Sequence, residues 1–112
     1  MLDQAKSDAT VRYVVGLLAA RQYDALERLS KGNRLSASKL RQAVEDYGRT
    51  VLPSPVGYEE PAAVTDAEPQ SWWVDVDLHT AEEGRSDLTL SLTLVDSPEA
   101  IYGVQVDDLH VL

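Results

Sequence analysis

The sequence predicts an α+β fold, with two to three N-terminal helices packed on one face of a three- to four-stranded antiparallel meander. Three observations predict it. Apolar residues recur at helical spacing in the first half of the chain, apolar and polar residues alternate in the second half, and a proline-rich segment separates the halves. A chain of 112 residues fits a single domain. We divide residues 1–112 into a helical region (1–48), a Pro-rich arm (49–71) and a sheet region (72–112).

The helical region opens with an apolar stripe that continues after an interruption near residues 21–23. Its members are Val11, Val14, Val15, Leu18, Ala25, Leu26 and Leu29. Ser7 or Asp8 is expected to cap the start, and Gly32 with Asn33 to end the second helix. We expect these residues to pack in the core, because so small a domain has few others to build one; an interaction groove is the alternative.

A further helix is predicted over residues 37–47, with Ser36 as its N-cap and Gly48 at its end. Four of the five prolines then fall in the Pro-rich arm, which excludes a helix interior or a central strand there. We expect one short edge strand near residues 58–64. The length of the arm favours a segment that wraps a sheet edge or covers a cleft.

Three strands are predicted over residues 72–80, 88–95 and 102–106, joined by loops over 81–87 and 96–100. Gly84 is expected to supply a positive φ in the first loop. A register that pairs Leu78 with Leu90, and Leu90 with Val106, puts the apolar residues on one face. The other face is then polar, apart from one row formed by Trp73, Val95 and Ile101.

Residues 73–90, together with 34–36, 47–48 and 106–112, resemble a family of small bacterial domains of unknown function. The segment Glu-Glu-Gly-Arg-Ser-Asp-Leu (82–88) is the specific part of this likeness. Helices followed by an antiparallel sheet also look, more loosely, like the cystatin-like or nuclear-transport-factor-two-like superfamily. The resemblance implies the fold and no particular activity.

A meander brings the loop after the first long strand close to the end of the last strand. We therefore expect Arg85 to lie among carboxylates near the C-terminal strand, in a structural or binding cluster that consists of Arg85, Asp87, Asp107, Asp108 and His79. The favoured interpretation is a bidentate salt bridge that fastens the loop. An anchor for an anionic ligand is the alternative.

No catalytic residue, metal site or cofactor is predicted. The histidines and carboxylates lack a metal-binding spacing, and no nucleophile elbow or phosphate-binding glycine run is present. Paired carboxylates at Asp75 and Asp77 are a possible acid–base pair, but nothing predicts their burial. The absence of cysteine excludes disulfides and thiolate chemistry, and it fits a cytoplasmic protein. We therefore expect a binding module in place of an enzyme.

The charge of −9 is unevenly distributed. Residues 1–50 hold nine Lys and Arg against six Asp and Glu, whereas residues 51–112 hold one Arg against thirteen acids. This balance opposes binding to nucleic acid and to anionic membranes. The longest apolar run, residues 14–20, is also far shorter than the ~20 residues of a membrane span.

We predict an acidic protein-interaction or accessory module, immunity-like in kind, that binds through a partner patch of Trp73, Val95 and Ile101. Its partner is expected to be a second copy in a homodimer, or a basic protein. The Pro-rich arm could instead cover the patch. The alternative function is a small-molecule-binding or hydrolytic domain of the nuclear-transport-factor-two-like kind, with a pocket between helices and sheet.

Overall fold

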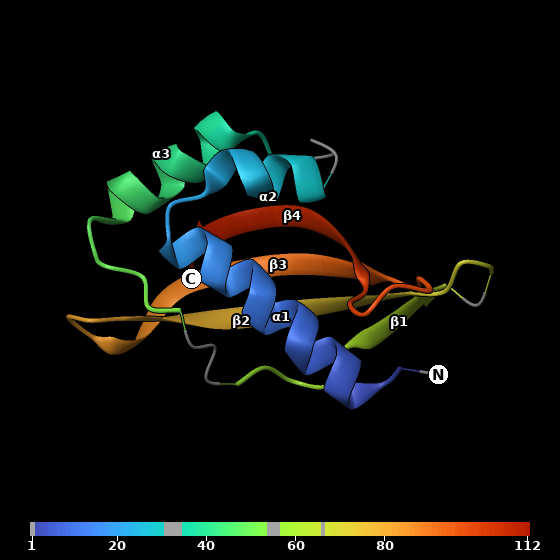
Figure 1. Cartoon of the computed structure of the whole chain (residues 1–112). Helices are drawn as coiled ribbons and strands as arrows, with labels where there is room; N and C mark the ends of the chain where they lie inside the picture. The colour runs from blue at the N-terminus through green and yellow to red at the C-terminus, as the bar shows by residue number, and fades with distance from the viewer. Residues whose placement is uncertain (1, 31–34, 54–56, 66) are drawn as a thin grey trace.

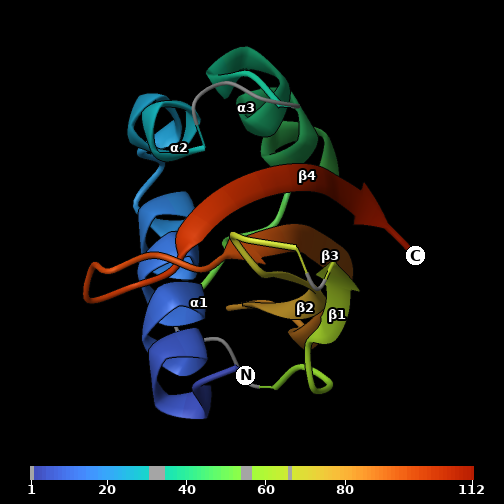
Figure 2. The ribbon, with the colours of Figure 1, turned by 90° about the vertical axis from the view of Figure 1, so that its right-hand side faces the viewer.

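Three helices precede a four-stranded antiparallel sheet, as the sequence predicts (Figure 1). This computed structural model describes residues 2–30, 35–53, 57–65 and 67–112. The strand order is β1-β2-β3-β4, so each strand pairs with its neighbour in the chain. Figure 2 shows the curvature of the sheet, with β4 arching beneath the second and third helices. The fold is therefore a meander with helices on one face and an opposite, outer face.

The first helix, α1, spans Gln4–Ala19. Its N-cap is Asp3, whose side chain accepts a hydrogen bond from the backbone N–H of Lys6. The prediction of a cap at Ser7 or Asp8 is wrong, because an acceptor at Asp3 satisfies the free N–H groups one turn earlier. The predicted stripe is confirmed, since its four α1 members are fully buried: Val11, Val14, Val15 and Leu18.

Two shorter helices follow, α2 over Tyr23–Leu29 and α3 over Ala37–Tyr47. The interruption predicted near residues 21–23 is confirmed, because α1 ends two residues before Arg21 and α2 begins two residues after it. Ser36 caps α3 as predicted, and Gly48 ends it with a φ of 71°. The predicted helix stop at Gly32 and Asn33 lies outside the described residues.

The strands span Ala62–Thr65 (β1), Ser71–Thr80 (β2), Gly84–Val95 (β3) and Gly103–Val111 (β4). The predicted register is wrong by two residues, because Leu90 pairs with Val76 and Val106 pairs with Leu92. In β2–β3, a turn of three residues in place of the predicted loop of seven moves the register by four, and an irregularity between Asp77 and His79 takes back two. In β3–β4 the connection is two residues longer than predicted, because Val95 pairs with Gly103. A shift of two keeps each residue on its predicted face, so the core still forms.

A bulge in β4 changes the pattern of burial near the C-terminus. Ser91 pairs with Asp108 while Leu92 pairs with Val106, which leaves Asp107 as the extra residue. Strict alternation from Val106 would turn Asp108 toward the core. Because of the bulge, the next buried apolar residue in β4 is Leu109, which is 7% exposed.

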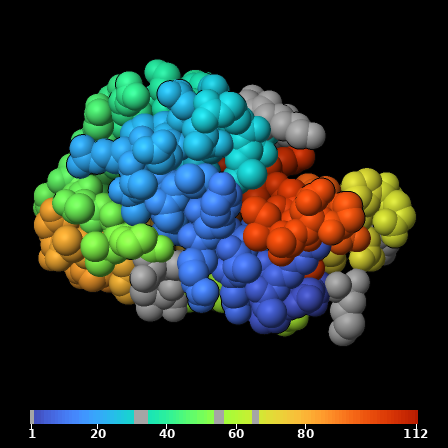
Figure 3. Space-filling model, viewed as in Figure 1, coloured from blue at the N-terminus to red at the C-terminus, as the bar shows by residue number. Residues whose placement is uncertain are grey.

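The helices and the inner face of the sheet share one apolar core. Trp72 is buried in it beside Tyr102, with ring centroids 5.3 Å apart. The β3–β4 loop packs against α1, where Lys6 Nζ donates to the carbonyl of Ser97 over 2.6 Å; in Figure 3 this loop is orange and α1 is blue. None of the described helices is long and apolar enough to cross a membrane.

The Pro-rich arm follows the edge of β2 that faces away from β3, which confirms that it wraps an edge of the sheet. Val51 makes an isolated bridge to Thr80, Tyr58 makes another to Val76, and β1 then pairs with the start of β2. β1 begins within the predicted range 58–64 and ends one residue beyond it. The arm thus forms one wall beside the outer face of β2.

Candidate functional site

Two adjoining hollows lie between the arm and the outer face of β2, and we call them together the outer groove. Their volumes are about 230 Å³ and 330 Å³. Both hollows are lined by Tyr58, Glu59, Asp77 and Arg85. The outer groove also includes His79 at one end, and Glu60, Trp73 and Asp75 toward the other. Most of the polar side chains that line it are carboxylates.

Trp73 is the large apolar residue of the outer groove. Strand alternation turns it away from the core, and it is 44% exposed while Trp72 is 6% exposed. The arm lies beside Trp73, through the pairing of Ala62, and leaves much of the indole uncovered. Trp is enriched at protein interfaces, where its ring is buried and its N–H finds a hydrogen-bond partner.

The predicted row of Trp73, Val95 and Ile101 does not form. In the observed register Trp73 pairs with Thr93, whereas Val95 pairs with Ser71 and Gly103. Ile101 precedes the start of β4 and pairs with neither. The two-residue register error has moved Trp73 into a polar row, so its neighbours across the strands are Thr93 and Gln105.

The carboxylates of β2 are held by neighbouring side chains. Asp75 accepts a hydrogen bond from the hydroxyl of Ser91, and Asp77 forms an ion pair with Arg85. Arg85 faces His79 across the β2–β3 pair, and its side chain is 74% exposed. Arg85 therefore forms an ion pair through one guanidinium nitrogen with a carboxylate of the neighbouring strand β2, and the predicted bidentate bridge to the C-terminal strand is wrong.

The predicted cluster around Arg85 is divided between separate places on the sheet. Asp107 accepts a hydrogen bond from Thr93, which lies eight residues, or about 26 Å, along β3 from Arg85. Asp108 lies opposite Ser91, with its carboxylate 3.1 Å from Nδ1 of His110. The expected proximity of Arg85 to Asp107 and Asp108 is wrong, because β4 pairs with the part of β3 beyond Leu88.

Asp87 precedes Leu88 in β3, at the end of the β3–β4 pairing where Leu88 pairs with Val111. Its side chain is exposed, and its backbone carbonyl accepts a hydrogen bond from the N–H of Leu112 over 2.9 Å. Its backbone therefore fastens the end of the chain to β3. Within the described part of the chain, no three His, Asp or Glu residues form a group that could hold a metal ion.

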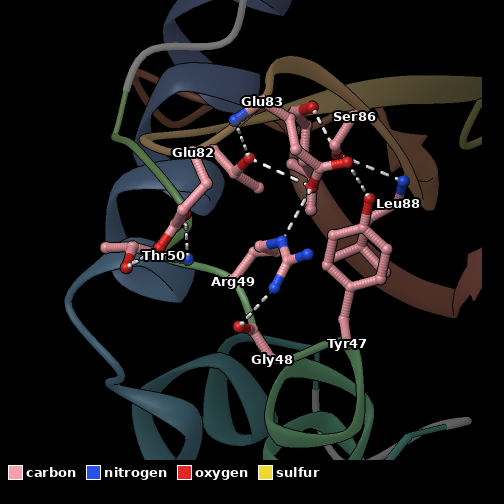
Figure 4. A network of polar contacts seen from close by, with 10 residues as sticks. Tyr47, Gly48, Arg49, Thr50, Glu82, Glu83, Ser86 and Leu88 are labelled. Carbon is pink, nitrogen blue, oxygen red and sulfur yellow. Dashed lines mark hydrogen bonds and ion pairs between the residues drawn. The ribbon is translucent and has the colours of Figure 1, made fainter.

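The turn between β2 and β3 carries a polar network that sequence reasoning missed (Figure 4). The carboxylate of Glu82 accepts hydrogen bonds from the N–H and the hydroxyl of Thr50 over 2.8 and 2.9 Å. Glu83 accepts a hydrogen bond from the Tyr47 hydroxyl over 3.0 Å. The bonds from Thr50 lower the pKa of Glu82, while burial and then the bond to Glu83 raise the pKa of Tyr47.

These contacts explain the segment Glu-Glu-Gly-Arg-Ser-Asp-Leu in structural terms. Gly84 has the predicted positive φ, 73°. Ser86 donates to the carbonyl of Leu78 over 2.8 Å and accepts from the N–H of Leu88 over 3.1 Å. The two glutamates join the hairpin to the start of the arm and the end of α3. In the sequence, the available signal for this network was a pair of adjacent glutamates with Arg85 as the one cation nearby along the chain.

The fold defines a small α+β domain whose helices cover one face of a sheet, with the outer groove and the exposed Trp73 on the other. The model of a family described as a domain of unknown function, DUF7668, matches residues 15–112, and the chain belongs to that family. No match was found among curated proteins or among solved structures. The family match gives no support to the cystatin-like or nuclear-transport-factor-two-like resemblance.

Proposed function

We propose that this protein is a non-catalytic binding module that receives a basic segment of a partner protein in the outer groove. The observation that carries the proposal is the position of Trp73, a 44%-exposed indole in a groove lined by carboxylates. A Lys or Arg side chain can lie over the face of a Trp ring while its charge meets neighbouring carboxylates. Aromatic residues of this kind supply much of the binding energy at protein interfaces.

The charges of the outer groove favour a cationic occupant. Glu59 and Glu60 are exposed on the arm, and Asp75 and Asp77 face them from β2. Arg85 offsets one of these charges through its ion pair with Asp77. Since residues 51–112 hold thirteen acids and one Arg, the surrounding field extends the same attraction beyond the groove and accelerates the encounter with a basic partner.

A homodimer through the outer groove is the less favoured use of this surface. A two-fold interface would set the four carboxylates of one copy against the same four of the other. Like charges brought together in this way oppose association. The alternative of a ligand site between helices and sheet also has less support, because His79 and Asp77 line a hollow on the outer face.

Fluorescence anisotropy with labelled synthetic peptides tests the proposal. The panel pairs Lys- and Arg-rich peptides with peptides of the same composition in which the basic residues are replaced by Gln. We expect the basic peptides alone to bind, and their affinity to fall between low salt and about 0.15 M salt. Trp73→Ala should weaken binding at least about tenfold, as for a hot-spot residue.

Tyr13→Ala is the matched control, because Tyr13 is an aromatic residue of similar exposure, 50%, on α1. It should leave the affinity within about twofold, which is the scatter expected for a residue outside the interface. Glu59→Gln combined with Glu60→Gln should weaken binding and reduce its salt dependence. An equal loss of peptide affinity in Trp73→Ala and Tyr13→Ala would refute the proposal. So would binding of the Gln peptides as tight as that of the basic peptides.

A further inference from the structure

A third hollow, of about 450 Å³, lies where the α1–α2 turn, α3 and the start of the arm meet. Figure 1 shows these three segments at the same end of the molecule. Three arginines line it, one from each segment: Arg21, Arg41 and Arg49. Glu45 is the one acidic residue of the lining. We call this hollow the arginine pocket; its charge is opposite to that of the outer groove.

Arg21 occupies a backbone position that favours glycine. Its φ is 59°, and it is the one non-glycine residue with positive φ in the described part of the chain. Gln22 donates its N–H to the carbonyl of Leu17 over 2.9 Å, and Arg21 donates to that of Leu18 over 3.0 Å. This is the Schellman pattern, in which glycine usually follows the helix end. A long side chain kept at a strained position indicates a use for that side chain.

Arg41 is oriented by an aromatic residue. Its guanidinium carbon lies 5.7 Å from the centroid of the Tyr23 ring, and Tyr23 is 4% exposed. Burial, and to a smaller extent Glu45, raise the pKa of Tyr23, while the charges of Arg21 and Arg41 oppose the rise. Both guanidinium groups therefore act on the same small region of the pocket.

Arg49 is held only loosely. Its Nε lies 3.9 Å from Oε1 of Glu83, and its Nη1 donates to the carbonyl of Gly48 over 3.5 Å. Figure 4 shows this guanidinium beside Glu83, which also accepts from Tyr47 and from Thr80. Neither contact is the bidentate pair that an arginine forms with a dedicated carboxylate. Its remaining N–H groups can therefore turn to a ligand.

We propose that the arginine pocket binds the phosphate groups of a phosphorylated small molecule. Guanidinium groups match phosphate oxygens with paired, charge-assisted hydrogen bonds, and three of them can surround a diphosphate group. The volume of about 450 Å³ lies in the range of small-molecule sites. This site is independent of the proposed function of the outer groove, because the two share no lining residue.

Isothermal titration of the full chain with inorganic pyrophosphate, and in parallel with adenosine diphosphate, tests the proposal. We expect saturable binding of at least one of them, with a Kd below about 1 mM, at about 0.15 M salt. Arg41→Ala should weaken it at least about tenfold. Tighter binding of the nucleotide would show that the ligand extends beyond its phosphates. No binding of either probe to the wild-type chain overturns the proposal.

Arg21→Gly separates a ligand-binding role from a structural one. Glycine suits the positive φ, so the melting temperature of this variant should be unchanged or higher than that of the wild type. Its affinity for the probe should nevertheless fall at least about tenfold. Arg28→Ala is the control, since Arg28 is an exposed arginine of α2 outside the pocket. Equal weakening by Arg28→Ala, or unchanged affinity in Arg21→Gly, overturns the proposal.

Discussion

The hydroxyl of Tyr58 in the Pro-rich arm donates a hydrogen bond to the carboxylate of Asp8 in α1. Two further α1 residues contact the same hydroxyl, Ser7 at 3.1 Å and Gln4 at 3.3 Å. Because Tyr58 also bridges to Val76 of β2, one residue joins the arm to both a helix and the sheet. This junction holds the arm in place as a wall of the outer groove.

Tyr58→Phe should lower the free energy of unfolding by about 1 kcal/mol, because it removes the hydroxyl and keeps the ring. Urea unfolding followed by circular dichroism measures the change. Tyr13→Phe is the control, since Tyr13 is 50% exposed and lies on α1, the helix that carries Asp8. It should have no measurable effect on the free energy of unfolding. A double-mutant cycle with Asp8→Ala should show coupling between the two residues. Strict additivity would contradict the hydrogen bond.

The same pair predicts a dependence on pH at both extremes. Burial, and then the bond to Asp8, raise the pKa of Tyr58 from 10 to about 12. The folded state holds this proton more tightly, so the stabilisation is complete below pH 10 and is lost as the pH rises through 12. The stability difference between the wild type and Tyr58→Phe should therefore shrink over that range. A constant difference would contradict the assignment.

At low pH the stability depends on the ionisation of Asp8, the carboxylate that accepts the hydrogen bond from Tyr58. The hydrogen bond from Tyr58, and then that from Gln4, hold the pKa of Asp8 below its ordinary value of 3.8. The stabilisation from Asp8 is thus present above that value and is lost as the pH falls through the lowered pKa. Acid titration of the Asp8 carboxyl by NMR should show a midpoint that returns toward 3.8 in Tyr58→Phe.

The bulge at Asp107 makes a prediction about the two residues that follow it. Leu109 is 7% exposed, so Leu109→Ala should cost about 2–3 kcal/mol of unfolding free energy. The Asp108 side chain is 57% exposed, so Asp108→Ala should change stability by less than about 0.5 kcal/mol. Chemical denaturation measures both. The reverse order would mean that β4 alternates without a bulge.

Arg85→Ala should lower the free energy of unfolding by less than about 1 kcal/mol. The reason is that its ion pair with Asp77 is formed by a side chain that is 74% exposed, and solvent screens such pairs. A salt bridge to buried carboxylates of the C-terminal strand, which is the arrangement predicted from the sequence, would cost roughly 1 to 3 kcal/mol when broken. Thermal and urea unfolding of Arg85→Ala and Arg85→Lys distinguish the two cases.

Glu82→Ala should release the start of the arm from the β2–β3 turn. The amide of Thr50 loses its acceptor at 2.8 Å, so its hydrogen exchange should accelerate. Glu99→Ala, an exposed acid in the β3–β4 loop, is the control and should leave that rate unchanged. Exchange of the Thr50 amide that is equally fast in the wild type would show that the bond does not persist in solution.

The sequence by itself determined the elements and their faces. Helical spacing identified the α1 stripe around Val14, and strand alternation separated Trp72 from Trp73, because burial selects apolar residues at the period of each element. Local conformational needs were also readable, as at Ser36, Gly48 and Gly84. The fold class, the edge strand and the position of the arm at a sheet edge followed from these local rules.

Only the tertiary structure decided which residues meet. The three-residue turn and the irregularity after Asp77 together moved the register by two at Trp73, which took Trp73 out of a row with Val95. Arg85 came to lie opposite His79, where it forms an ion pair with Asp77. A shift of two leaves every face unchanged, so the pattern of apolar residues cannot report it. The three arginines of the arginine pocket likewise come from separate segments. Their proximity depends on how helices pack, which no local spacing records.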